Sequence, residues 1–287
     1  MPAPAQPAQD TLDLSVLAPA HNEEDNIGPL VERVSQALGP LAASEGVTWE
    51  MIVVDDGSTD RTRARLMDLT RSRPWLRVIE MRDPPPGAGM GQSAAFHAGF
   101  RAARGRFVAT LDADLQNDPA DLPRLWLLLH EHEADMVQGD RTVARADGVH
   151  RKAGAAVGRA FRRMILGDTI RDTGCSLRIL RREAALRLPL EFRGAHRFIP
   201  ACVRRLGYTV IETPVAHHAR TAGESKYGMG IVQRAIPGLM DCFAMRWMFS
   251  RMRSTRAIEI TPSAHASGRD DGADRADALE RREGRSS

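Results

Sequence analysis

Short apolar runs alternate with amphipathic stretches over the first half of the chain. The apolar runs end in turn-forming or acidic residues, as buried strands of a parallel sheet do. Each run is followed by apolar residues three or four positions apart, the spacing of one helix face, as in Ile27, Leu30 and Val34. This alternation predicts an α/β fold, a mostly parallel sheet with helices on both faces. The predicted strands span 14–20, 50–55, 76–81 and 106–114.

The pattern is less regular from residue 135 onward. It indicates strands at 135–141 and 208–218 and a basic helix rich in Gly and Ala at 150–166. We predict four parts: a flexible N-terminus (1–11), an α/β domain (12–228), an amphipathic helical segment (229–256) and a disordered charged tail (257–287).

Composition excludes several classes of protein. A net charge of +3 is too small for a general nucleic-acid binder of 287 residues. The three cysteines lack the pairing of a zinc site or a disulfide framework, so a reduced, cytoplasmic protein is expected, with Cys175 as buried packing. Residues 1–10 show no signal peptide. The longest apolar stretch, 231–249, contains charged residues and a proline, so no transmembrane helix is expected.

Asp112 and Asp114 stand two residues apart in the stretch LDADLQNDP, residues 111–119. At the carboxyl end of a strand, both side chains are expected to face the crevice where such sheets bind ligands. Carboxylates this close repel each other unless a cation lies between them. Mg²⁺ or Mn²⁺ fits such oxygen ligands and usually completes its shell with substrate phosphates and water. A turn whose aspartates cap the following helix is the alternative.

Two other predicted strands also end in acidic or amide residues. VVDDGSTD, residues 53–60, places Asp55 and Asp56 at one strand end, and PAHNEE, residues 19–24, follows another. The carboxyl ends of parallel strands meet at one edge of a sheet. These residues are therefore expected on one rim, where the base and ribose of a nucleotide could be hydrogen-bonded.

Read in chain order, four stretches resemble the motifs of family 2 glycosyltransferases of the GT-A fold, which is Rossmann-like. They are PAHNEE, VVDDGSTD, LDADLQ and RTAGESKYG (220–228). GDR (139–141) and DTGCSLRILRRE (172–183) resemble the branch of dolichol-phosphate mannose synthases and bacterial polyprenyl-phosphate glycosyltransferases. The resemblance implies transfer of a sugar, with inversion, from a GDP-mannose or UDP-hexose type of donor to undecaprenyl or dolichyl phosphate.

The resemblance also implies a role for each matching residue. The nucleotide sugar would be bound by Pro19, Ala20, Asn22, Glu23, Asp55, Asp56, Asp112, Ala113, Arg220, Ser225 and Lys226. The Mg²⁺ or Mn²⁺ ligands would be Asp112, Asp114 and Gln116. The catalytic group would be Asp114, Asp172, Arg220 and Lys226. In it, Asp172 would lie near the sugar or acceptor, and the two cations would approach the diphosphate.

Such a reaction needs no dedicated general base from the protein. A lipid phosphate has a second pKa of about 6, so near neutral pH it is already an anionic nucleophile. The enzyme must stabilise the departing nucleoside diphosphate and align the attack. Lys226 is one of only two lysines in a chain otherwise rich in arginine, which marks it for a task that needs a compact point charge.

Several alternatives remain open. DPPPGAGM (83–90) replaces the polar residues expected before the helix that starts GQSAAF, so this loop is either a plain connection or specific to the substrate. A family 2 enzyme acting on a soluble or polysaccharide acceptor in cell-envelope biosynthesis is one alternative function, and a non-catalytic nucleotide-sugar-binding protein is another. The segment 228–254 is either a packing helix or an interfacial helix in peripheral contact with the cytoplasmic face of the inner membrane. The sequence does not predict the sugar, the nucleotide or the oligomeric state.

Overall fold

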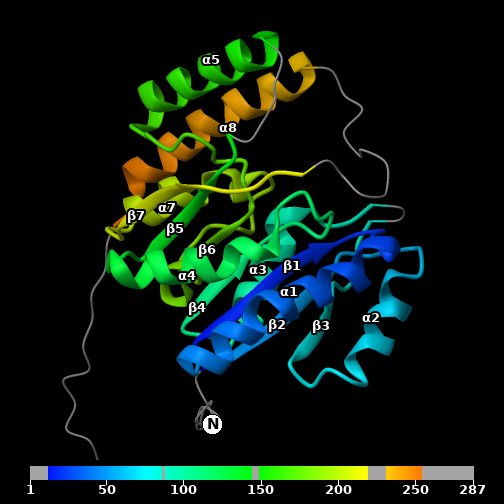
Figure 1. Cartoon of the computed structure of the whole chain (residues 1–287). Coiled ribbons are helices and arrows are strands. Elements are labelled where there is room, and N and C mark those ends of the chain that lie inside the picture. The colour runs from blue at the N-terminus through cyan, green and yellow to red at the C-terminus, as the bar shows by residue number, and fades with distance from the viewer. Residues whose placement is uncertain (1–11, 86–87, 144–148, 219–230, 254–287) are drawn as a thin grey trace, which may run out of the picture. The chain divides into compact units, whose positions relative to one another are not determined.

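The computed structural model describes residues 12–85, 88–143, 149–218 and 231–253. In this part of the chain seven strands form one sheet, in the order β3-β2-β1-β4-β6-β5-β7 (Figure 1). Neighbouring strands run parallel except at β6, which is antiparallel to both β4 and β5. The predicted α/β fold with a mostly parallel sheet is confirmed.

The strands are β1 (Leu14–Ala20), β2 (Trp49–Asp55), β3 (Leu76–Glu80), β4 (Phe107–Thr110), β5 (Met136–Asp140), β6 (Arg178–Arg181) and β7 (Val210–Pro214). The α-helices are α1 (Glu24–Glu45), α2 (Thr62–Thr70), α3 (Gln92–Ala102), α4 (Leu122–Glu131), α5 (Val149–Leu166), α6 (Arg182–Ala185), α7 (Ile199–Arg205) and α8 (Ile231–Arg251). Two short 3₁₀ helices are η1 (Pro119–Asp121) and η2 (Ala195–Phe198).

The central strands are apolar on both sides because helices cover both faces of the sheet. In β1, Val16 and Ala18 face one core, whereas Leu17 faces the other. The first core packs β1 and β2 against α1 and α4, and the second packs them against α3 and α7. Strands buried in this way read as unbroken apolar runs, which is why the sequence revealed them.

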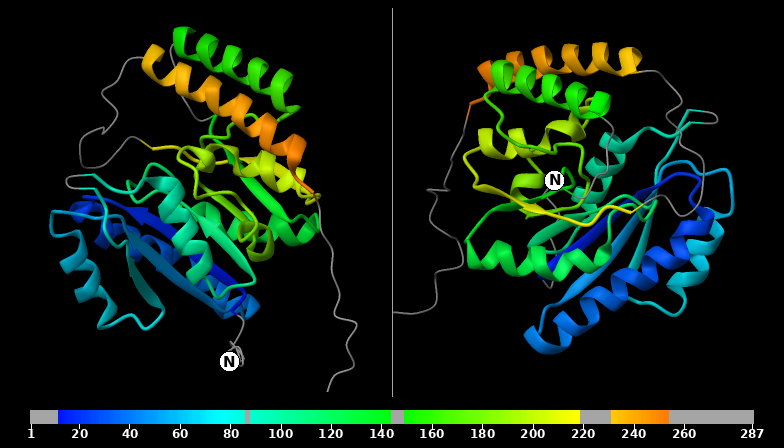
Figure 2. Two further views of the ribbon diagram at one scale, coloured as in Figure 1. Left: turned by 180° about the vertical axis from the view of Figure 1, so that it is seen from behind. Right: turned by 45° about the horizontal axis from the view of Figure 1, so that its top comes forward.

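A further layer lies outside α7, formed by α5 and α8 (Figure 2). The two helices pack against each other, with the rings of Phe161 and Phe243 edge to face at 5.7 Å between centroids. On α8, Cys242, Met245 and Phe249 face inward and belong to the second core. Helix α8 therefore packs onto the α/β domain, at least along this side. Among the helices that the structure describes, none is long and apolar enough to cross a membrane.

Two strands are several residues shorter than the sequence predicts. The strand expected over 106–114 ends at Thr110. Its neighbour β6 begins at Arg178, directly opposite Thr110, so no partner continues the ladder on that side. The strand expected over 208–218 spans only Val210–Pro214. Strand β6 itself was not predicted, because four residues carry too little periodicity.

Candidate active site at the carboxyl ends of the strands

The two aspartates of the LDADLQNDP stretch lie in the loop that follows β4, not in the strand. Leu115, with φ of 60°, turns the chain there, and the backbone N–H of Gln116 donates to Asp114 Oδ1 at 3.2 Å. Asp114 is 7% exposed. The turn thus brings the backbone of Gln116 onto the carboxylate of Asp114.

The carboxyl group of Asp112 has a raised pKa. Burial raises the pKa of its carboxyl group, and the neighbouring charge of Asp114 raises it further. A hydrogen bond from Ser176 and the charges of Arg141 and Arg178 oppose this rise without cancelling it. The side-chain amide of Gln92, the first residue of α3, donates to Asp112 Oδ1 at 2.7 Å.

Two neighbouring carboxylates fit a divalent cation. Asp112 and Asp114 would supply carboxylate oxygens, and Mg²⁺ commonly takes its remaining ligands from water and substrate phosphates. In the described part of the chain, no group of three or more histidine, cysteine, aspartate or glutamate side chains could hold a metal alone. A cation here would therefore depend on the amide of Gln116 and on substrate oxygens.

Asp172 forms a buried, two-pronged ion pair with Arg141. The Arg141 guanidinium donates from Nε to Asp172 Oδ2 at 2.8 Å and from Nη2 to Oδ1 at 3.1 Å. The backbone N–H of Arg141 donates to the same carboxylate at 3.2 Å. Burial acts to lower the pKa of Arg141, but Asp172 outweighs it and the net pKa is raised. Asp172, predicted to lie near the sugar or acceptor, thus lies in the same cluster as Asp112, held by an arginine.

Arg178 is a second buried arginine of this cluster. It is the first residue of β6, and it pairs in register with Thr110 of β4 and Gln138 of β5. It is 2% exposed, and burial lowers its pKa to about 10. Its Nη2 donates to the carbonyl of Cys175, while Nε and Nη1 find no hydrogen-bond partner among the described residues. The charges of Asp112 and Asp172 act on it.

The ends of β1 and β2 form the predicted nucleoside rim. The backbone N–H of Asp56 donates to the carbonyl of Ala20 at 2.8 Å, and the backbone N–H of Asn22 donates to Ser58 Oγ at 3.0 Å. In return, Asn22 Oδ1 accepts from the backbone N–H of Thr59 at 2.7 Å. Asn22 has φ of 53°, a left-handed conformation that asparagine tolerates better than most residues. These bonds fix the two loops to each other.

The remaining predicted rim residues have defined partners. Glu23 accepts from the side chain of Asn26 at 2.7 Å, and the buried Asp55 accepts from the backbone N–H of Ser58 at 3.1 Å. Pro19 is partly exposed at the end of β1. Ala20 and Ala113 are buried, at 2% and 3% exposure.

The end of the loop before α3, residues 89–91, is tied to this rim through Asp56. The backbone N–H groups of Met90 and Gly91 each donate to the Asp56 carboxylate at 2.8 Å. Gly89 lies so close that an added Cβ would stand 2.2 Å from Asp56 Oδ2. Gln92 follows Gly91 and bonds Asp112, so the start of α3 contacts both Asp56 and Asp112.

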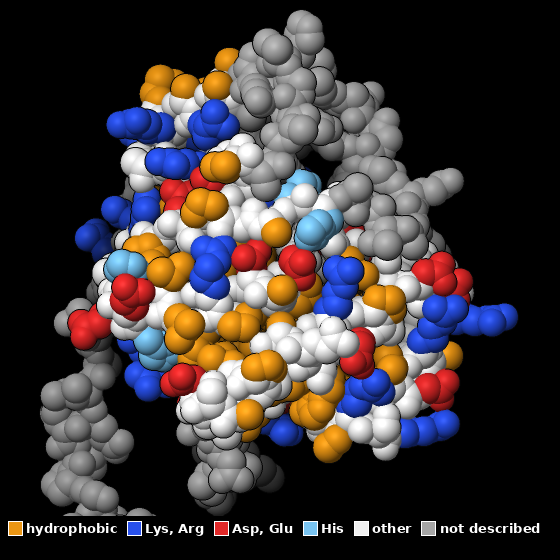
Figure 3. Space-filling view, viewed as in Figure 1, with side chains coloured by type: hydrophobic (Ala, Val, Ile, Leu, Met, Phe, Trp, Pro, Cys, Tyr) orange, Lys and Arg blue, Asp and Glu red, His pale blue; other side chains and the backbone are white. Residues whose placement is uncertain are grey.

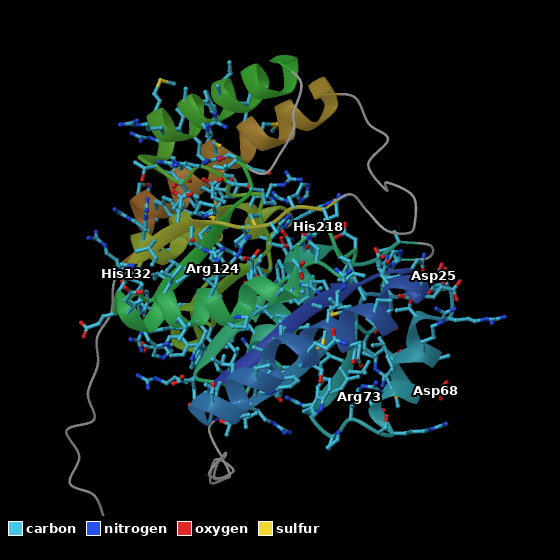
Figure 4. All side chains as sticks on the ribbon, in the orientation of Figure 1. Asp25, Asp68, Arg73, Arg124, His132 and His218 are labelled. Atoms are coloured by element: carbon cyan, nitrogen blue, oxygen red, sulfur yellow. The ribbon has the colours of Figure 1, made fainter. Side chains whose placement is uncertain are left out.

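The segment after β7 leads the chain back to the aspartate loop. Asn117 and His217 form an isolated antiparallel β-bridge, and the backbone N–H of His218 donates to the carbonyl of Gln116 at 2.9 Å. The Nε2 atom of His218, which is labelled in Figure 4, lies 3.1 Å from Asp118 Oδ2. The predicted residues Arg220, Ser225 and Lys226 lie outside the described residues.

Sequence reasoning missed three residues of this cluster: Gln92, Arg141 and Arg178. Arg141 and Arg178 stand in stretches that carried the family resemblance, GDR and DTGCSLRILRRE, and that was the only available signal. Cys175 is fully buried, and burial raises the pKa of its thiol to about 11, so the expectation of buried packing is confirmed.

Known proteins match this chain over most of its length. The sequence profile of glycosyl transferase family 2 matches residues 15–188. The dodecaprenyl-phosphate galacturonate synthase of Rhizobium johnstonii is 40% identical over 243 residues, which are 83% of this chain and 68% of that protein. The undecaprenyl-phosphate 4-deoxy-4-formamido-L-arabinose transferase of Edwardsiella ictaluri is 33% identical over 229 residues, 80% of this chain and 67% of that protein.

A solved structure shares the fold. The glucosyl-3-phosphoglycerate synthase of Mycobacterium tuberculosis, in complex with Mg²⁺ and uridine diphosphate, superposes with a TM-score of 0.58 at 23% identity. The match covers 81% of this chain and 80% of that one. At this identity the likeness concerns the fold alone.

Proposed function

The chain belongs to glycosyl transferase family 2, and from that membership we propose that it transfers a sugar from a nucleotide sugar to a polyprenyl phosphate with inversion. One observation carries the choice of acceptor: the 40% identity, over 83% of this chain, to a relative named for a dodecaprenyl-phosphate product. The second relative, 33% identical, is named for an undecaprenyl-phosphate acceptor.

The donor would lie along the rim from β1 to the aspartate loop. The loops at Asn22 and Asp56 would enclose the nucleoside, and Asp112, Asp114 and Gln116 would hold Mg²⁺ or Mn²⁺. When bound, the cation would neutralise negative charge on the diphosphate as the leaving group departs. Arg220 and Lys226 are proposed to bind the same diphosphate as fixed positive charges.

The acceptor phosphate needs positive charge on the opposite side of the sugar. Arg141 is oriented by Asp172 and carries a raised pKa, so it stays charged at any pH at which the enzyme could work. We assign Asp172 a positioning role through Arg141, because Arg141 engages both of its carboxylate oxygens. A phosphate monoester near neutral pH attacks without a protein base.

Contact with a membrane would bring the lipid acceptor to the site. Helices α5 and α8 expose large apolar side chains: Val157, Met164, Met240, Phe243 and Trp247. Figure 3 shows hydrophobic and basic side chains side by side at the top left, over α5. Apolar and basic residues on one surface suit the interface of an anionic membrane. The proposed location is peripheral, on the cytoplasmic face of the inner membrane.

The test is incubation with undecaprenyl phosphate, Mg²⁺ or Mn²⁺ and a panel of radiolabelled nucleotide sugars, followed by organic extraction. Label is expected in the organic phase with one donor. Label that enters only soluble or polysaccharide acceptors would refute the lipid acceptor. A lack of transfer to any acceptor, with intact nucleotide binding, would favour the non-catalytic alternative.

A conservative substitution tests the proposed role of Lys226. Lys226→Arg keeps the charge but replaces a compact ammonium by a planar fork, so kcat is expected to fall at least about tenfold. Lys152→Arg, at the other lysine, is the matched control and should leave kcat unchanged. Equal kinetics of the Lys226→Arg variant and the wild type would show that this lysine is incidental.

A further inference from the structure

A cavity of about 440 Å³ opens where the carboxyl ends of α5 and α8 meet α7. It is lined by Ile165, Leu166, Gly167, Asp168, Ala201, Arg204, Arg205, Arg246, Phe249 and Ser250. None of these residues belongs to the candidate active site, which lies at the strand ends. Nothing in the proposed transfer reaction uses this cavity.

The cavity carries surplus positive charge. Arg204, Arg205 and Arg246 form no salt bridge with any described residue. The single carboxylate of the lining, Asp168, is already engaged, because Arg162 Nε donates to it at 2.7 Å and the backbone N–H of Ile170 at 3.0 Å. The three guanidinium charges are therefore not neutralised by the cavity's own acid.

The three arginines are nevertheless held in place. Arg246 donates to the carbonyl of Ile165 at 2.7 Å, and Arg205 donates to that of Phe249 at 2.9 Å. Arg204 donates to Thr169 Oγ1 at 2.6 Å and to the carbonyl of Val210 at 3.2 Å. All of these acceptors are neutral. Because a guanidinium has five N–H donors, each arginine keeps donors to spare.

Helix capping explains only part of this arrangement. Arg246 and Arg205 bond carbonyls near the ends of α5 and α8, where a cation is favoured by the helix dipole. Arg204 bonds no carbonyl of either helix and instead joins Thr169 to β7. Arg205 and Arg246 are exposed and Arg204 is half-buried, so an anion that enters the cavity from solvent can reach the spare donors of all three.

We propose that this cavity binds a phosphoryl-bearing ligand, with Arg204, Arg205 and Arg246 as the anion-binding groups. Guanidinium forks match phosphate oxygens. The volume exceeds what a lone phosphate fills, and Ile165, Leu166 and Phe249 give it apolar walls, so the ligand carries an organic part. The inference rests on this cavity and does not require the proposed transferase reaction.

Two sources could supply such a ligand: a lipid headgroup or a soluble phosphate ester. The cavity lies next to the exposed apolar surface of the same helices. Met164 directly precedes the lining residue Ile165, and Trp247 directly follows the lining residue Arg246. A membrane that reaches these two side chains would bring headgroups near the mouth of the cavity. The shared chemistry is the phosphoryl group, and the experiment separates the two sources.

The test compares a cavity variant with a charge-matched control. Arg205→Gln/Arg246→Gln removes two charges and keeps amide donors for the helix carbonyls. Arg33→Gln/Arg101→Gln removes two exposed arginines from α1 and α3. One arm titrates each protein with inorganic phosphate and with glycerol 1-phosphate by calorimetry. The other measures flotation with phosphatidylcholine vesicles, with and without phosphatidylglycerol. Circular dichroism and thermal unfolding verify that each variant folds.

The cavity variant is expected to bind at least about tenfold more weakly in one arm, while the control behaves like the wild type. A loss confined to phosphatidylglycerol vesicles identifies a lipid headgroup, and a loss in the glycerol phosphate titration identifies a soluble ester. Phosphate bound at the active site would persist in both variants. Equal behaviour of the two double variants in both arms would overturn the proposal.

Discussion

Asp112 and Asp172 are carboxylates of the same site with opposite surroundings. Asp172 is saturated by donors from Arg141, whereas Asp112 faces the charge of Asp114, and its pKa is raised by burial and by that charge. In the proposed site, Asp172 would therefore position Arg141, and Asp112 and Asp114 would hold the cation.

Removing the charge of Asp172 should destabilise the protein strongly. Asp172→Asn leaves the buried Arg141, 6% exposed, without its counter-charge, which typically costs about 3–5 kcal/mol of unfolding free energy. The measurement is urea unfolding. Arg141→Met/Asp172→Leu, which removes both charges, should recover much of the loss. If Asp172→Asn unfolded at the wild-type urea concentration, the pair would not be buried as described.

His196 should give the protein an acid-sensitive step. Its Nδ1 lies 2.8 Å from Ser93 Oγ, and burial, followed by the charges of Arg197 and Arg178, lowers its pKa from 6.5 to about 3. Between these values the unfolded chain binds the proton and the folded chain does not. Stability is therefore complete above about pH 6.5 and falls toward pH 3, by up to about 1.4 kcal/mol per pH unit from this residue.

The matched variants isolate that step. His196→Gln keeps a hydrogen-bonding partner for Ser93 and should flatten the loss of unfolding free energy between these pH values. His132→Gln, at an exposed position after α4 (Figure 4), should retain the wild-type slope. If unfolding free energy fell equally with pH in both variants, His196 would not be the cause of the loss.

At the scale of elements, sequence patterns revealed strands and motifs that are continuous in the chain. They missed contacts between segments that are far apart in the sequence. The long apolar strands and the motif with Asp112 and Asp114 are visible without a structure. The contribution of Arg178 depends on β6, a short antiparallel strand inserted between β4 and β5. The contribution of Gln92 depends on where α3 begins relative to the loop that follows β4. No local pattern encodes either contact, so propensity and periodicity could not identify them.

The loop before α3 provides a test of one such contact. In Gly89→Ala, a Cβ 2.2 Å from Asp56 Oδ2 would push the loop away and break the bonds from Met90 and Gly91. Donor affinity is expected to fall about tenfold, with a loss of about 1–2 kcal/mol in unfolding free energy. Calorimetric titration with the donor measures the first and urea unfolding the second.

Gly158→Ala is the control for that substitution. Gly158 is exposed inside α5, and a Cβ there meets nothing within 4 Å. It should stabilise the protein by about 0.5–1 kcal/mol, because alanine favours the helix, and it should leave donor binding unchanged. Donor binding of Gly89→Ala equal to that of Gly158→Ala would show that the loop does not shape the rim.

At the scale of the described α/β domain, the site lies where the two parts of the sheet meet. β1 is flanked by β2 on one side and β4 on the other, and crevices form where the strand order reverses in this way. The rim at β1 and β2 comes from the N-terminal part of the chain. Arg141, Asp172 and Arg178 come from the part built around β5 and β6. A ligand that touches both would join the two parts.

Donor binding should therefore stabilise the whole domain, and only together with a divalent cation. The nucleoside diphosphate of the donor, uridine or guanosine diphosphate, should raise Tm in the presence of Mg²⁺ or Mn²⁺. At a nucleotide concentration of a hundred times Kd, the gain in unfolding free energy should be about 2.7 kcal/mol. Chelation with EDTA should abolish the rise. Asp114→Asn should abolish it as well, whereas Asp68→Asn, exposed on α2 (Figure 4), should not. A rise that survives both EDTA and Asp114→Asn would show that the nucleotide binds without the aspartate pair and would remove the metal from the proposed site.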